Sequence, residues 1–156
     1  MITSDLISSG FFNAQLKDGL PDRTYNAGNL TDYLGGLITD GVLANPSTNL
    51  QVQAGSGLEF IIKSGKVWVD GHFFTASGDI EFTIDSPDTL LPRIDSITLK
   101  LDKTERTLVL DYKKGTAATT PTVPALTNTE QIKELRLANI RVEANTTAIT
   151  TEKITD

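Results

Sequence analysis

Residues 97–112 read ITLKLDKTERTLVLDY, and they indicate the fold class more clearly than any other part of the chain. Apolar and polar side chains alternate on both sides of the polar segment 102–105, with apolar residues at Ile97, Leu99, Leu101, Leu108, Leu110 and Tyr112. A period of two is typical of a strand with one buried face, and two such strands around a short polar turn form an antiparallel hairpin. We therefore predict a β-hairpin here within a mainly β fold.

The same period extends toward the N-terminus. Apolar positions alternate in the segments 50–52, 58–62, 67–69 and 80–84, and Gly-, Ser- and Asp-rich turn signals separate them. Short strands at spacings of roughly 8–12 residues are typical of an antiparallel sandwich or barrel. We predict one antiparallel β-sandwich domain over residues 26–156.

The phase of the alternation changes near the C-terminus. The apolar positions of 135–137 and those of 140–142 would lie on opposite faces of a regular strand. One extra residue restores a common face, so we predict a β-bulge near Ala138 and Asn139.

One segment has helical periodicity instead. Its apolar residues fall at i, i+3, i+4, i+7 and i+8, namely Leu30, Tyr33, Leu34, Leu37 and Ile38. This stripe predicts an amphipathic helix over about 27–40, which Asn26 or Asn29 would cap and Gly41 would end. Residues 1–25 keep no single period, and we expect them to form an extended N-terminal arm.

The composition excludes several classes of function. The 156 residues include 14 Lys and Arg against 20 Asp and Glu, a net charge of −6, with no cysteine and a single histidine. An acidic chain is a poor ligand for nucleic acid, and the absence of cysteine excludes disulfides and thiolate chemistry. No apolar run approaches the roughly 18–20 residues needed to cross a bilayer, so we expect no membrane partner. We find no catalytic, metal or cofactor motif and expect a non-enzymatic protein.

Two groups of residues are candidates for protein contacts. The first lies in the arm and helix, where exposed aromatic side chains would be costly and adjacent glycines let another backbone approach closely. The second lies in the extended connection 115–127. The candidates are Phe11, Phe12, Tyr25, Gly35, Gly36, Pro121 and Pro124.

A different hypothesis concerns the strand around Trp68. Val67 and Val69 point to one face, so Trp68 points to the other, and His72 and Phe73 follow a tight turn. Aromatic rings on an open sheet face can stack on a sugar ring, which would make this segment a carbohydrate-binding site. If the helix covers the same face, Trp68 belongs to the core instead, and we favour that interpretation.

The order of motifs along the chain resembles the module at the N-terminus of receptor-binding and fibre proteins in the tails and baseplates of long-tailed phages of Gram-positive bacteria. The segments that carry the resemblance are 23–27, 36–42, 45–52, 65–71, 91–95, 113–115, 121–127 and 154–156. They occur in the same order from about residue 10 to the end.

This resemblance implies a shoulder-like β-sandwich module that anchors part of the tail tip in the virion. It implies a homo-oligomer, with a trimer favoured, that is made in the host cytoplasm and docks to another phage tail or baseplate protein. Relatives usually continue past the Ile-Thr-Asp motif into a host-binding head, so we expect receptor binding to lie outside this chain. The carbohydrate-binding module for host cell-wall polysaccharide is the alternative.

Overall fold

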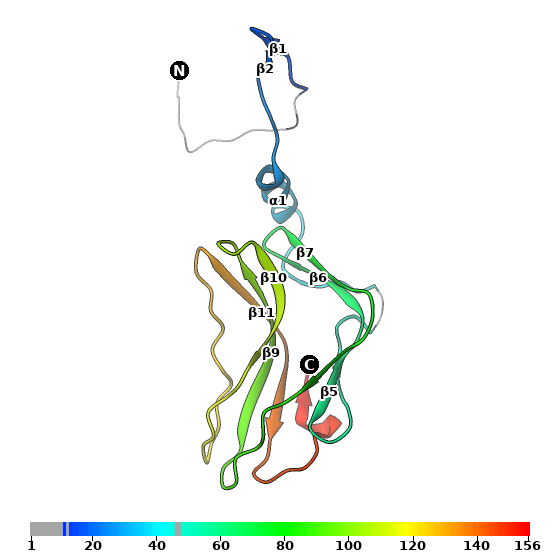
Figure 1. The fold of residues 1–156 in the computed structure, drawn as a ribbon, viewed down its shortest axis with the longest axis vertical. Coiled ribbons are helices and arrows are strands. Elements are labelled where there is room, and N and C mark those ends of the chain that lie inside the picture. Colours follow the sequence, from blue (N-terminus) through cyan, green and yellow to red (C-terminus); the bar gives the residue numbers. More distant parts are fainter. Residues whose placement is uncertain (1–10, 12, 46–47) are drawn as a thin grey trace.

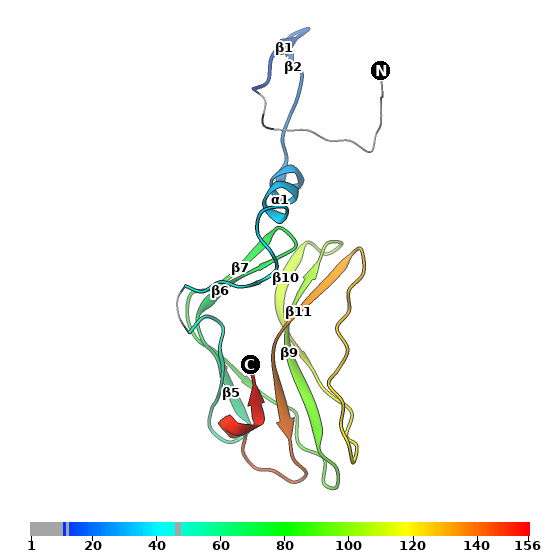
Figure 2. The same cartoon turned by 180° about the vertical axis from the view of Figure 1, so that it is seen from behind.

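The computed structural model describes residues 11, 13–45 and 48–156. The chain is mainly β, and every sheet formed by these described residues is antiparallel. Most strands form a body, and α1 (Ala27–Gly35) and the arm before it stand off one end of that body (Figure 1). The view from behind shows the same projection (Figure 2). Within the described part of the chain, α1 is the only α-helix.

A four-stranded sheet forms one side of the body. Its order is β10-β9-β11-β12, with bounds β9 (Arg93–Asp102), β10 (Thr107–Lys113), β11 (Ile132–Val142) and β12 (Ile154–Thr155). Leu108 pairs with Leu101 and Tyr112 with Ile97, which confirms the hairpin predicted from residues 97–112.

The predicted bulge is present in β11, slightly earlier than expected. The register with β9 shifts between Arg136 and Ala138, so Leu137 is the extra residue. The shift lets Leu137, Ala138 and Ile140 all be buried, although they lie on both sides of the phase change.

Two smaller sheets complete the body. One has the order β3-β6-β7 and the other β4-β5-β8. Their bounds are β3 (Gly41–Val42), β6 (Gly65–Val69), β7 (His72–Ala76), β4 (Val52–Ala54), β5 (Glu59–Ile62) and β8 (Ile80–Thr83). In both views β5, β6 and β7 lie across from β9 and β11 (Figures 1 and 2).

One hydrophobic core joins the three sheets. Many of its members are the apolar positions of the segments in which apolar and polar residues alternate. They include Phe60, Ile62, Val67, Val69, Ile97, Leu99, Leu101, Ile140 and Val142. Burial of these side chains is the main favourable contribution to folding.

The helix α1 has a complete capping box at its start. The side-chain oxygen of Asn26 accepts the backbone N–H of Asn29 at 3.1 Å, and that of Asn29 accepts the N–H of Asn26 at 3.0 Å. Each bond satisfies a backbone donor that helix geometry leaves open.

The helix is shorter than the predicted range of about 27–40. Gly35 is its last residue and Gly36 its C-cap, whereas Gly41, which we expected to end the helix, begins β3. Each glycine lowers helix stability by about 1 kcal/mol relative to Ala, so two in succession end the helix rather than weaken its middle. One further turn follows, in which the N–H groups of Leu37 and Ile38 both donate to the Leu34 carbonyl.

The arm contains a small hairpin, β1 (Leu16–Lys17) paired with β2 (Leu20–Pro21). In Figure 1 it is the described element farthest from the body. At the other end of the chain, η1 (Thr151–Lys153) is a single 3-10 turn that leads into β12.

Candidate functional site

Exposed apolar side chains are concentrated in residues 11–43, which comprise the described part of the arm, α1, the turn after it and β3. Among the described residues fourteen large hydrophobic side chains are exposed, and nine of them lie between residues 11 and 43. We call these nine the N-terminal apolar surface: Phe11, Leu16, Leu20, Tyr25, Leu30, Tyr33, Leu37, Val42 and Leu43. Scattered apolar residues are normal on a protein surface, so the gathering of these nine in one stretch of the chain makes that stretch a candidate interaction surface.

Three aromatic rings of this surface form a cluster. The Phe11 ring stacks on Tyr25 with centroids 5.8 Å apart and meets Tyr33 edge-on at 4.7 Å. Tyr33 belongs to α1, so the cluster fixes the arm against the helix. The structure thus brings together two predicted contact residues, Phe11 and Tyr25, whereas Phe12 lies outside the described residues.

The helix approaches the body closely at the turn between β6 and β7. A β-carbon on Gly35 would stand 3.5 Å from the backbone nitrogen of Gly71, and one on Gly71 would overlap the carbonyl oxygen of Thr31. The close backbone approach that we expected at Gly35 therefore occurs within the chain. Gly36, the C-cap, lies beside the carbonyl of Tyr33 instead.

A groove of about 970 Å³ lies where α1 meets the β6–β7 and β9–β10 turns. The three residues proposed for glycan contact, Trp68, His72 and Phe73, all line it. They differ in exposure: Trp68 is 9% exposed, Phe73 is 73% exposed and His72 is half-buried. The indole N–H of Trp68 is buried and has no hydrogen-bond partner among the residues that the structure describes. Trp68 therefore packs into the wall of the groove, and Phe73 is the ring open to solvent.

Charged residues line the rim of the groove. Lys103 forms an ion pair of 2.5 Å with Asp70, which connects the β9–β10 turn to the β6–β7 turn. The hydrogen bond from Lys103 lowers the pKa of Asp70. Asp40 accepts the backbone N–H of Asp70 at 2.7 Å, which also connects the segment after α1 to this turn.

The connection that contains Pro121 and Pro124 lies against the sheet, and both prolines are half-buried. Arg136 of β11 donates to the carbonyl of Pro124 at 2.5 Å. Lys113 of β10 donates to the carbonyl of Ala125 at 3.0 Å, so side chains of two strands hold the connection. Its backbone is therefore partly occupied within the chain.

The carboxylate of Glu134 completes this attachment. It accepts Lys113 Nζ at 2.6 Å and the backbone N–H of Thr127 at 2.6 Å. Burial acts to raise the pKa of Glu134, but the hydrogen bonds from Lys113 and Thr127 outweigh it, and the pKa is lowered.

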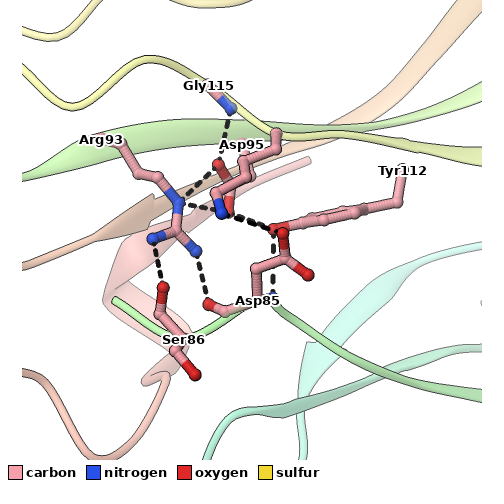
Figure 3. Close-up of polar contacts among 7 residues, drawn as sticks. Asp85, Ser86, Arg93, Asp95, Tyr112 and Gly115 are labelled. Atoms are coloured by element: carbon pink, nitrogen blue, oxygen red, sulfur yellow. Dashed lines mark hydrogen bonds and ion pairs between the residues drawn. The ribbon is translucent and has the colours of Figure 1, made fainter. Parts of the chain in front are cut away.

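A buried polar network at the start of β9 has no counterpart among the predicted sites. Arg93 is 2% exposed and Asp95 is fully buried, and Arg93 Nε donates to both Asp95 carboxylate oxygens at 3.0 and 3.1 Å. The two guanidinium ends donate to the backbone carbonyls of Asp85 and Ser86 (Figure 3). Arg93 thus holds the loop after β8 against the sheet.

Asp95 holds a second segment. It accepts the hydroxyl of Tyr112 at 2.6 Å and the backbone N–H of Gly115 at 2.8 Å (Figure 3). Burial, followed by the hydrogen bond to Asp95, raises the pKa of Tyr112 to about 12. The network thus connects β9 and β10 to the loop after β8 and to the segment that follows β10.

Two further classes of site were considered across residues 11, 13–45 and 48–156. No cluster of three or more His, Cys, Asp or Glu side chains is arranged there to hold a metal ion. No described helix has the length and apolar character needed to cross a membrane.

Searches of protein-family models, of curated proteins and of solved structures found no significant match to this chain.

Proposed function

We propose that the chain is a non-enzymatic structural module of a phage tail tip or baseplate, which acts there as an assembly or adaptor part. The three antiparallel sheets around one core are consistent with the β-sandwich expected for such a module. The motif order that resembles tail and baseplate proteins supports the phage context.

The observation that carries this proposal is the N-terminal apolar surface. The body buries its own core, whereas six of the fourteen large exposed apolar side chains lie in the arm and α1, which project from it, and three more lie in residues 37–43. An assembly module needs a surface of this kind, because burying apolar area is the main driving force of stable association.

The experiment is to locate the chain in phage particles. Antibodies against the body, applied to purified tailed particles from the source strain, should label the distal end of the tail in electron micrographs. Mass spectrometry of the same particles should detect the chain in fixed proportion to the known tail proteins. Absence of the chain from purified particles would contradict the proposal.

A carbohydrate-binding function is a second candidate, because the groove brings together Trp68, His72 and Phe73. The exposed ring of Phe73 would supply the stacking surface, and Asp102 and Arg106 on the rim would supply polar contacts. Binding of cell-wall polysaccharide that Phe73→Ala abolishes, without a change in stability, would support it. The burial of Trp68 counts against stacking by the indole itself.

A further inference from the structure

The strand β10 forms an open edge of the four-stranded sheet. It is the end member of the order β10-β9-β11-β12, so one side of it pairs with β9 and the other side pairs with no described strand. Within residues 11, 13–45 and 48–156, no backbone hydrogen bond joins β10 to any segment other than β9. An edge strand leaves about half of its N–H and C=O groups without a ladder partner, and this row of groups can pair with another extended segment.

The edge lacks the features that usually prevent strand addition. With seven residues, β10 is the longest edge strand of the described chain, in which the other edge strands have two to five. It contains no proline, and its register with β9 has no bulge. Its one lysine, Lys113, donates to Ala125 and Glu134 within the chain. Edges that are closed to other chains typically carry a proline, a bulge or a free lysine.

The core-facing side chains of β10 are incompletely covered. Leu108 and Leu110 are half-buried, whereas their partners on β9, Leu101 and Leu99, are 2% and 0% exposed. All four pack in or against the same core, but β9 has a strand on both sides and β10 has a strand on one. A further strand beside β10 would bury the remaining apolar area, which favours association.

The groove under α1 lies beside the start of this edge. Thr107 and Leu108 belong to its lining, and the groove has a volume of about 970 Å³. A segment paired with the outer edge of β10 would place every second side chain on the same face as Leu108. At the other end of β10, the backbone N–H of Asp85 donates to the Tyr112 hydroxyl, so the loop after β8 limits the open edge to residues 107–111.

One charged side chain beside the edge is available to an occupant. Arg106 directly precedes β10, lines the groove, is exposed and forms no ion pair with the described residues. Lys103 is already paired with Asp70, Asp102 accepts N–H groups of its own turn, and Asp32 lies on α1. Opposite charges on neighbouring strands stabilise their pairing, so an acidic residue fits the position beside Arg106.

We propose that the outer edge of β10 and the adjoining groove bind an extended segment of another protein by strand addition. The segment runs antiparallel to residues 107–111, and its alternate apolar side chains lie beside Leu108 and Leu110. It carries an acidic residue near its C-terminal end, beside Arg106. This inference rests on the proposed assembly role and specifies the chemistry of the docking partner. A glycan fits less well, because it lacks the alternating backbone donors and acceptors that the edge of β10 would pair with.

The first test uses peptides and leaves the protein unaltered. A display library of random eight-residue peptides is selected on the wild-type chain, and the binders are synthesised. Each binder is then N-methylated at every second backbone amide, in two complementary sets. One set should lose at least about tenfold in affinity and the other should keep its affinity, because alternate amides of a strand face the edge with which it pairs.

The second test locates the bound peptide by hydrogen exchange. Binding should protect alternate backbone amides within residues 107–111. It should leave β12, the edge strand on the far side of the same sheet, unchanged.

The third test concerns the charge beside the edge. Arg106→Glu should weaken the binding of peptides that carry the acidic residue by about three- to tenfold. Lys66→Glu is the matched control, because it makes the same charge change at an exposed position of β6 outside the groove lining. It should leave the affinity unchanged. The unfolding midpoint of each variant without peptide verifies that the fold is kept.

Four results would overturn the inference. They are a selection that yields no binding peptide, equal effects of the two N-methylated sets, protection by the peptides outside β10, and protection of the groove by cell-wall polysaccharide but not by peptides. The last result would favour the carbohydrate-binding alternative. Failure of the proposed function is a separate result, because the chain could be absent from purified particles and still bind such peptides.

Discussion

The carbonyl oxygen of Thr31 in α1 lies 2.2 Å from the position that a β-carbon on Gly71 would take, which is too close for both atoms. Gly71 has a φ of +76°, which L side chains rarely adopt, and it follows Asp70 with a φ of +45° in the two-residue turn of the β6–β7 hairpin. An Asp-Gly pair with positive φ at both positions is the preferred sequence for such a turn. The same glycine thus serves the hairpin and lets the helix rest on it.

Gly71→Ala should separate α1 from the body. The new methyl group overlaps Thr31, and the backbone is strained as well, so we expect a loss of about 1–3 kcal/mol in the free energy of unfolding. Chemical denaturation followed by Trp68 fluorescence measures it. Gly78→Ala is the matched control, because no atom lies within 4 Å of its β-carbon position and its φ is ordinary. Equal stability of the two variants would contradict this account.

Arg93→Met should be among the most destabilising single changes in the body. It leaves the fully buried Asp95 without its charged partner, and removing one member of a buried pair costs about 3–5 kcal/mol. The comparison is Arg141→Met, whose ion pair with Glu143 is exposed and is worth at most about 1 kcal/mol. Thermal unfolding of both variants measures the difference. Similar losses in the free energy of unfolding would show that the Arg93 network is not a main source of the body's stability.

Tyr112 should make the fold sensitive to alkali. Its pKa is about 12 in the folded chain against an ordinary tyrosine pKa of 10.0, so the folded state binds the proton more tightly than the unfolded state does. Stability is therefore retained below pH 10 and is lost as the pH rises from about 10 to 12, by an amount on the order of 2 kcal/mol. Denaturation at several pH values measures it.

Tyr112→Phe is the control for that measurement. It removes the titrating hydroxyl, so its stability should fall less than that of wild type over the same interval. Parallel curves for the two proteins would mean that Tyr112 ionises equally in both states.

Glu134→Gln should alter the acid limb of the stability curve. Because the pKa of Glu134 is lowered, its ionised form favours the folded state at pH values above the ordinary glutamate pKa of 4.5. This contribution is lost as the pH falls through the lowered pKa. We expect Glu134→Gln to cost about 1–2 kcal/mol at pH 7, and the difference from wild type to shrink in acid. Glu81→Gln, at an exposed position on β8, should show no such convergence.

The strands were easier to predict from the sequence than the polar sites. Alternation around residues 102–105 predicts the β9–β10 pairing, because one face of each strand is buried and the other is not. Arg93 and Asp95 were not predicted as a site, since charged residues at a strand end usually face solvent. Their burial depends on carbonyl groups of Asp85 and Ser86, a contact that no periodicity reveals.

The helix illustrates a different limit of prediction from sequence. Its apolar stripe is visible in the sequence, but the pattern does not tell whether the partner belongs to the same chain. The body covers Leu34 and Ile38 only partly and leaves Leu30, Tyr33 and Leu37 exposed. The alternation of side chains in β6 predicts that Trp68 faces away from Val67 and Val69. It does not predict the burial of the indole, which depends on tertiary contacts with other parts of the chain.

The position of β9 between β10 and β11 has a consequence for the order in which the chain folds. β10 follows β9 after residues 103–106, whereas β11 follows β10 only after residues 114–131. Closing a short loop costs less entropy, so the β9–β10 pair should form first and β11 should dock onto it later. Refolding kinetics should then be slowed more by Leu110→Ala than by Ile140→Val, relative to the stability each change removes. During folding, β9 would meanwhile expose one unpaired edge, which makes the interval before β11 docks the stage at which copies could pair wrongly.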